Sequence, residues 1–201
     1  MISTIIEHIA SLTLQFINAT GYAGVFLLSA LESCAIPIPS EVVVPFSGFL
    51  AADGHFNLIT VIILATLGNW LGSLALYYIG RSGGRLVIEK YGKYVLIHKS
   101  DLDWADDWFR RHGPATVFWS RVLPVVRTFS SLPAGIAGMN LKKFHIYTLA
   151  GSAIWNTGLA LIGYKTGEHW DSLHVYFQKF DIAIAVVLVI AIGLYVYKHI
   201  R

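Results

Sequence analysis

The sequence predicts an all-α polytopic membrane protein with two inverted re-entrant helical hairpins, about three transmembrane helices and interfacial amphipathic helices. Three observations support this fold class. The chain is 55% hydrophobic and 13% charged, with a mean hydropathy of +0.60, whereas a soluble domain carries about 25% charged residues. None of its 15 Lys and Arg residues occurs in residues 1–80. In addition, four ionisable residues lie near prolines inside apolar stretches.

Three apolar stretches are predicted to cross the membrane. Residues 57–80 contain no formal charge, and residues 144–164 contain only His145 as a group that titrates near neutral pH. Both are long enough, because about 20 helical residues cross about 30 Å of hydrocarbon. A third helix is predicted at 180–198, where the apolar core 182–197 is flanked by charged residues.

Residues 22–52 are interpreted as a hairpin rather than a single span. Two apolar halves of about a dozen residues surround a proline-containing middle, and halves of that length suit re-entrant helices. In one continuous helix, Glu32 and Glu41 would point about 180° apart, so that one carboxylate would face lipid. A break at Pro37 and Pro39 removes this conflict.

Residues 114–139 are interpreted as a second hairpin for the same reason. Arg121 and Arg127 would diverge by about 120° in an unbroken helix. Breaks at Pro124 and Pro133 would allow both guanidinium groups to converge. Broken backbone at membrane depth persists only where protein or a wet cavity satisfies its polar groups.

The basic residues predict the topology of the chain. Seven Lys and Arg residues fall in 81–111, so the positive-inside rule places the loop 81–113 and the C-terminus in the cytoplasm. The hairpin-plus-span unit then occurs twice in opposite orientations, as in many secondary transporters. The predicted organisation is one membrane domain, 1–201, made of repeat 1 (20–80), a cytoplasmic amphipathic segment (81–113), repeat 2 (114–165) and a C-terminal transmembrane helix (180–198).

Several other classes of function are disfavoured. The basic loop explains the pI of about 9.0, so no nucleic-acid partner is predicted. The single Cys34 excludes an intramolecular disulfide and is interpreted as a packing residue. Four aspartates in 100–112 lack the Gly and the bidentate Glu of a calcium loop, and they fit the solvated face of an interfacial helix. A similar interfacial helix is predicted at 2–19. No metal or cofactor is predicted.

The four intramembrane charges are the candidate site. A charge in hydrocarbon costs at least about 2.5–3.5 kcal/mol, so such residues usually face a cavity, a partner or a substrate. One interpretation is structural, with two Glu–Arg pairs locking the hairpins together. The other is functional: Arg121 and Arg127 present planar donors suited to phosphate, and Glu32 and Glu41, once desolvated, can carry protons.

Specific motifs then indicate a family. Glu32 is followed by PIPSE (37–41), and the span ends in YYIGR before Gly84. R-x-x-P-x-x-R at 121–127 leads into PAGIAGM (133–139). With these motifs the chain resembles the DedA family of bacterial inner-membrane proteins, within the wider SNARE-associated or VTT-domain superfamily. The resemblance covers about residues 20–165, and it implies two opposed re-entrant hairpins and matches Glu32, Glu41, Arg121 and Arg127 to the family's essential residues. One departure is Ser73, where many relatives are acidic.

The resemblance implies a proton-motive-force-linked flippase for undecaprenyl phosphate or phospholipid headgroups that supports envelope integrity. The predicted partners are therefore a lipid phosphate or phospholipid headgroup, protons and the bilayer, with a homo-oligomer left open. Three alternatives remain: a proton-coupled exporter of organic cations or drugs, an intramembrane lipid-phosphate enzyme, and a structural assembly factor. The enzyme is disfavoured, because the S-R-x5-H signature of lipid phosphatases would need His where Ser120-Arg121 is followed by Arg127.

Overall fold

The computed structural model describes residues 2–36, 38, 40–84, 99–123 and 126–166, which form helices and turns without any strand. The predicted all-α class is therefore confirmed. The elements are α1 (Ile2–Thr20), α2 (Tyr22–Ser33), α3 (Ser40–Ala52), α4 (Leu58–Ile79), the π-helical segment η1 (Gly80–Gly84), α6 (Lys99–Val122), α7 (Val126–Phe129), α8 (Ser131–Ile136) and α9 (Leu141–Thr166).

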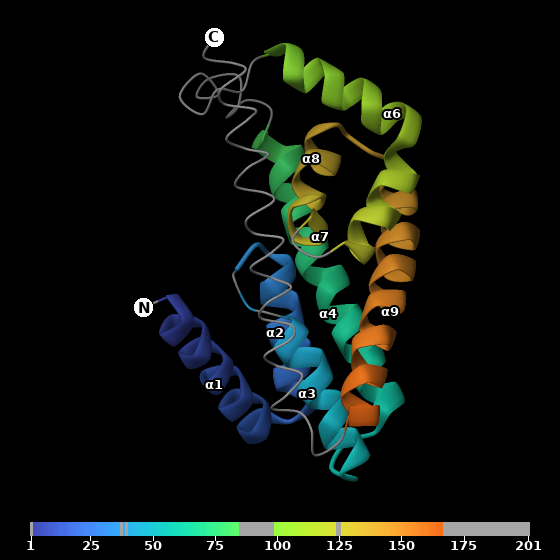
Figure 1. Cartoon of the computed structure of the whole chain (residues 1–201). Coiled ribbons are helices and arrows are strands. Elements are labelled where there is room, and N and C mark those ends of the chain that lie inside the picture. Colours follow the sequence, from blue (N-terminus) through green and yellow to red (C-terminus); the bar gives the residue numbers. More distant parts are fainter. Residues whose placement is uncertain (1, 37, 39, 85–98, 124–125, 167–201) are drawn as a thin grey trace.

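Two long antiparallel helices, α4 and α9, form the centre of the bundle (Figure 1). Near one end, α2 packs on α4 and α3 packs on α9. Near the other end, α8 packs on α4 and η1, while α6 packs on α9. Both chain reversals, from α2 to α3 and from α6 to α7, point toward the middle of the bundle (Figure 1). The reversals predicted from the intramembrane prolines thus have counterparts in the fold, whereas re-entry without crossing stays a prediction.

Small residues bring the helix backbones together. A Cβ atom at Gly72 of α4 would clash with the carbonyl oxygen of Ala30 in α2, so only glycine permits this approach. On the other side, a Cβ atom at Gly163 of α9 would clash with the carbonyl of Pro45 in α3. The two helices of the first reversal are therefore fixed to different central helices.

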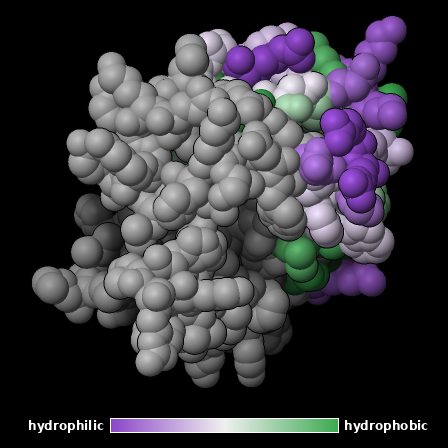
Figure 2. All heavy atoms as spheres, turned by 90° about the horizontal axis from the view of Figure 1, so that it is seen from above, coloured by the Kyte–Doolittle hydropathy of each residue, from purple (hydrophilic) through white to green (hydrophobic). Residues whose placement is uncertain are grey.

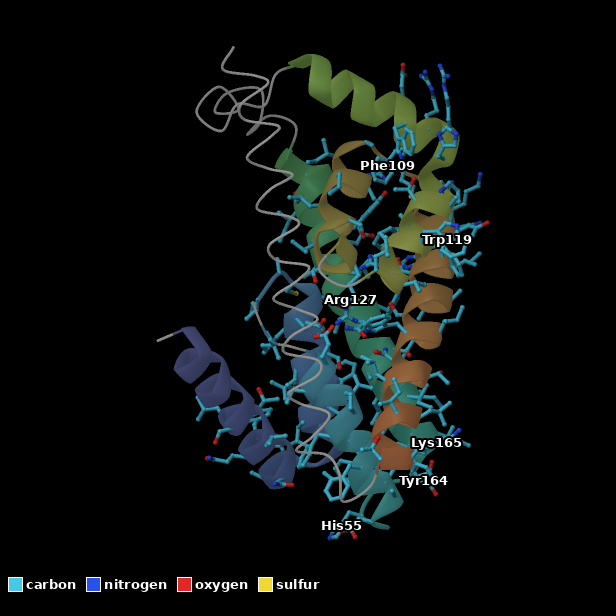
Figure 3. The ribbon with its side chains drawn as sticks, viewed as in Figure 1. His55, Phe109, Trp119, Arg127, Tyr164 and Lys165 are labelled. Atoms are coloured by element: carbon cyan, nitrogen blue, oxygen red, sulfur yellow. The ribbon has the colours of Figure 1, made fainter. Side chains whose placement is uncertain are left out.

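Two apolar clusters lie at opposite ends of the bundle. The first includes Val25, Val43, Val61 and Leu159, from α2, α3, α4 and α9. The second joins α4, α6, α8 and α9 through Tyr77, Phe109, Val117, Ala134 and Phe144. Figure 3 shows Arg127 about midway along the bundle, away from Phe109 near one end and from His55 and Lys165 at the other. The candidate charges therefore lie between the two apolar cores.

One described helix, Leu58–Gly84, is long and apolar enough to cross a membrane, which fits the span predicted at 57–80. The helix predicted at 144–164 is present as α9, with 26 residues. It is less apolar than α4, because it contains Lys142, Lys143, His145 and Lys165, whereas α4 has no charged residue. The predicted C-terminal helix at 180–198 lies outside the described residues, so the number of spans stays a prediction.

Two helix boundaries differ from the sequence prediction. The segment 100–112 and the start of the second hairpin are one helix, α6, with Pro114 inside it. The two halves of α6 run in different directions (Figure 1), as expected where proline removes a backbone hydrogen bond. Pro133 lies in the first turn of α8 and not at a break. A proline is tolerated there, because the N–H group that it lacks would have no acceptor within the helix. Pro37, Pro39, Pro124 and 85–98 lie outside the described residues.

Hydrophilic side chains gather at the end of the bundle formed by α6 (Figure 2). The described exposed basic residues near this end include Arg81 of η1, Arg110 and Arg111 of α6, and Lys142 and Lys143 at the start of α9. This is the end for which the charge distribution predicts a cytoplasmic location.

Candidate functional site

Four charged side chains meet where the two chain reversals approach each other. Glu32 lies in the last turn of α2 and Glu41 in the first turn of α3. Arg121 lies in the last turn of α6, and Arg127 lies in α7. Their exposed fractions are between 2% and 8%. The structure therefore collects all four predicted site residues in one buried cluster.

Arg127 contacts both carboxylates of the other reversal. Its Nη2 atom forms an ion pair with Oε1 of Glu32 and lies 3.6 Å from Oε1 of Glu41. The guanidinium carbon also lies 5.1 Å from the ring centre of Trp155 in α9, within the range of a cation–π contact. One arginine thus links α7 to α2, α3 and α9.

Arg121 has a different set of partners. Its Nη1 atom donates to the backbone carbonyl of Arg127, and its Nη2 atom donates to Oγ of Ser131 at 2.7 Å. Because α7 has only four residues, its backbone carbonyls need hydrogen-bond partners outside that helix. Arg121 therefore stabilises the second break, and the guanidinium groups are not arranged as two separate Glu–Arg pairs.

A buried amide pair beside the charges was missed by the sequence analysis. Nδ2 of Asn69 in α4 lies 3.0 Å from the Ser29 carbonyl, 2.9 Å from Oγ of Ser33 and 3.4 Å from Oε2 of Glu32. Asn156 of α9 donates to Oδ1 of Asn69 at 2.9 Å. An asparagine in the middle of each long apolar stretch was the available signal, since polar groups in a membrane usually face the protein interior.

The two tryptophans in the central helices differ in their hydrogen bonds. Nε1 of Trp70 in α4 donates to Nδ1 of His145 at 2.8 Å, so this indole is satisfied within the protein. Nε1 of Trp155 in α9 is buried and has no partner among the described residues. The sequence analysis singled out neither ring, because tryptophan is common in membrane helices.

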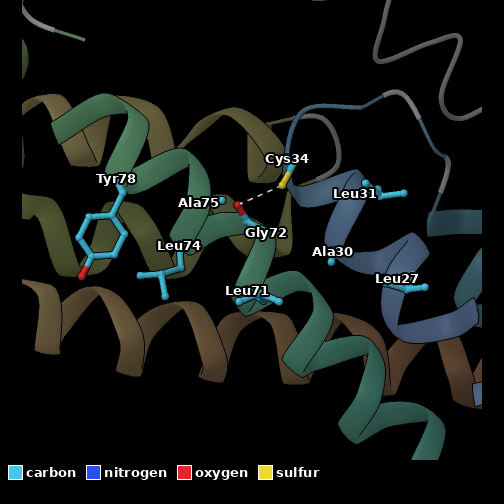
Figure 4. A pocket seen from close by; sticks show the side chains of 9 residues that line it. All are labelled: Leu27, Ala30, Leu31, Cys34, Leu71, Gly72, Leu74, Ala75 and Tyr78. Carbon is cyan, nitrogen blue, oxygen red and sulfur yellow. Dashed lines mark hydrogen bonds between the residues drawn. The ribbon is translucent and has the colours of Figure 1, made fainter. Parts of the chain in front are cut away.

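An apolar groove of about 400 Å³ lies between α2 and α4 (Figure 4). Leu27, Leu31, Leu71 and Tyr78 line it and are partly exposed. At its edge, Sγ of Cys34 lies 3.6 Å from the carbonyl oxygen of Gly72, which agrees with a packing role for this cysteine. Such a surface suits contact with hydrocarbon.

The charged side chains of the cluster can each replace one charged partner with another. Two carboxylates and two guanidinium groups balance formally, and removing one partner of a buried pair typically costs about 3–5 kcal/mol. A ligand that engages Arg127 must therefore compensate for the carboxylate contact that it displaces. No group of three or more His, Cys, Asp or Glu side chains that could hold a metal occurs in the described part of the chain.

Comparisons of the sequence with known proteins identify one family. The model of the VTT domain matches residues 38–165, from just before α3 almost to the end of α9. The chain belongs to the VTT-domain family. The predicted resemblance to DedA proteins is confirmed, because protein DedA of Escherichia coli is 26% identical over 165 residues, covering 80% of this chain and 74% of that protein.

Two other relatives of this VTT-domain protein are more similar. Undecaprenyl phosphate transporter A of Staphylococcus aureus is 35% identical over 190 residues, covering 92% of this chain and 94% of that protein. An alkaline phosphatase-like protein of Lactococcus lactis is 35% identical over 195 residues, covering 92% and 91%. No solved structure matches the chain. The apolar composition and the family together identify an integral membrane protein.

Proposed function

We propose that this VTT-domain protein moves a lipid phosphate, such as undecaprenyl phosphate or a phospholipid headgroup, across the bacterial inner membrane. By the positive-inside rule, the loop 81–113 and the C-terminus would lie in the cytoplasm. The observation that carries the proposal is the simultaneous contact of Arg127 with two buried carboxylates from the opposite reversal. The name of the S. aureus relative, undecaprenyl phosphate transporter A, supports the choice of substrate.

In the proposed cycle the phosphate competes with the carboxylates for Arg127. A guanidinium group binds phosphate through paired hydrogen bonds, so the anion replaces Glu32 or Glu41 as its partner. A carboxylate left buried without a cation takes up a proton, because its charged form is no longer stabilised. Phosphate binding is thus accompanied by proton uptake at the displaced carboxylate.

Arg121 has a supporting part in this proposal. Its two terminal nitrogens hold the backbone of α7 and the Ser131 hydroxyl, while its Nε atom is buried and has no partner among the described residues. Arg121 thus shapes the second break and leaves one donor to contribute, with Arg127, to the phosphate site.

A cation exporter fits this geometry less well. A cationic cargo would have to displace Arg127 from both carboxylates, and the arginine would then remain buried beside a second positive charge. The anionic cargo avoids this conflict, because it replaces one negative partner of Arg127 with another.

Reconstitution into liposomes tests the proposal. The purified protein should move labelled undecaprenyl phosphate between leaflets, faster with a pH gradient than without one, and binding should strengthen as the pH falls, because the bound state holds more protons. Undecaprenol, which lacks phosphate, is the matched control lipid. Release of inorganic phosphate would instead support the lipid-phosphate enzyme, and transport of a lipophilic cation without phosphate-dependent lipid binding would support the exporter.

A further inference from the structure

The indole of Trp155 has an unsatisfied polar atom beside the principal cation of the site. The side chain is half-buried on α9, and its Nε1 atom is buried without a hydrogen-bond partner among the described residues. A buried indole N–H usually has an acceptor. The ring lies against the Arg127 guanidinium, with 5.1 Å between the ring centre and Cζ.

The comparison with Trp70 shows that the fold can satisfy a tryptophan in this region. Trp70 lies on the other central helix, and its N–H donates to His145 at 2.8 Å. The Arg127 guanidinium beside the Trp155 ring carries only donors, so it offers the indole N–H no acceptor. Of these two tryptophans, Trp155 is the one that lacks an acceptor among the described residues.

The unpartnered donors define what could occupy the site. An indole N–H and a guanidinium Nε–H can only donate, so two donors without partners cannot satisfy each other. Besides Nε1 of Trp155, the Nε atom of Arg121 is buried without a partner among the described residues. The complementary ligand has several acceptor oxygens and a negative charge, and a phosphate group meets both requirements.

We propose that Trp155 donates a hydrogen bond from Nε1 to the phosphate bound by Arg127 and is therefore a specificity-determining residue for the lipid phosphate. This inference rests on the proposed function. The indole belongs to α9 and Arg127 belongs to α7, so the two donors would reach the anion from different helices. Because the indole is neutral, it contributes a directed hydrogen bond to the phosphate and not a charge interaction.

The test is a pair of measurements on the full-length protein in detergent. In protein labelled with ¹⁵N at the tryptophan indoles, the Trp155 N–H signal should shift when undecaprenyl phosphate or inorganic phosphate is added, and it should stay in place with undecaprenol. Trp155→Phe keeps an aromatic ring for Arg127 but removes the donor. It should bind undecaprenyl phosphate about tenfold more weakly, as expected for one lost hydrogen bond to a charged group.

Trp119→Phe is the matched control, because Trp119 is 63% exposed on α6 and should not change phosphate affinity. If Trp155→Phe does not fold, the wild-type signal can be assigned by elimination with Phe variants of the other five of the six tryptophans. Arg127-dependent phosphate binding with an unmoved Trp155 signal would overturn this inference and leave the proposed function intact. If neither undecaprenyl phosphate nor inorganic phosphate binds, both fail.

Discussion

Replacing Arg127 by Lys tests whether the planar guanidinium, and not positive charge alone, binds the lipid phosphate. Lysine preserves the charge that balances the carboxylates of Glu32 and Glu41. It replaces a rigid fork of donors with one ammonium group on a flexible stem. The variant therefore separates charge from geometry at a single position.

The size of the effect follows from the contacts of Arg127. One Nη atom serves both carboxylates, and the guanidinium carbon lies over the Trp155 ring, 5.1 Å from its centre. A lysine can retain an ion pair, but it loses one directed hydrogen bond to a charged oxygen, worth about 1.5–3 kcal/mol. Since each 1.4 kcal/mol is tenfold, phosphate affinity should fall by about 10- to 150-fold. The free energy of unfolding should fall less in Arg127→Lys than in Arg127→Ala, where the buried carboxylates lose their partner at a cost of about 3–5 kcal/mol.

Binding of undecaprenyl phosphate and of a lipophilic cation would be measured for the wild type, Arg127→Lys and Trp119→Phe. Monodispersity and thermal unfolding in detergent show whether each variant is folded. Unchanged phosphate affinity in a folded Arg127→Lys protein would refute the argument for a guanidinium-specific site. Tight cation binding that is lost in Glu32→Gln but insensitive to Arg127→Lys would favour the exporter.

Three further predictions concern the carboxylates, the topology and the amide pair. Glu32→Gln and Glu41→Gln should abolish transport in folded protein, whereas Asp at either position should retain some; full activity of either Gln variant would remove the proton role there. After Cys34→Ser, single cysteines at Asn18 and His55 should react from the same side of the membrane, and labelling from opposite sides would exclude the first hairpin. Asn69→Leu should lower the unfolding temperature, because it leaves polar partners such as the Ser29 carbonyl unsatisfied; an unchanged temperature would show that the amide contacts contribute nothing.

Much of the helical arrangement could be predicted from hydropathy and proline. Residues 57–80 became α4 and residues 144–164 lie within α9, because long apolar stretches have few stable alternatives to a helix. The continuation of α6 through Pro114 could not be predicted, since packing against α9 decides whether a proline ends a helix or bends it. Local sequence reports the tendency and not the tertiary contacts that override it.

The candidate site was only partly predictable for a similar reason. Charge in an apolar environment identified Glu32, Glu41, Arg121 and Arg127 one by one. Their pairing depends on distances between residues up to 95 positions apart, so the sequence left open which arginine serves the carboxylates and which serves the backbone. Asn69 and Asn156 carry no charge and give a weaker signal, although they form a hydrogen bond between the two central helices.

The close glycine contacts have a consequence for movement. The backbones approach so closely at Gly72 and at Gly163 that a single Cβ atom would not fit between them, so we expect α2 to move with α4 and α3 with α9 as two rigid bodies. The seam between these bodies is crossed by the Asn69–Asn156 hydrogen bond, and Arg127 reaches a carboxylate in each body. Polar contacts of this kind can be replaced by contacts to water or ligand. Separating closely packed backbones would instead lose van der Waals contacts with no replacement. Rocking of one body against the other would therefore open the bundle along this seam, at the depth where the phosphate is expected to bind.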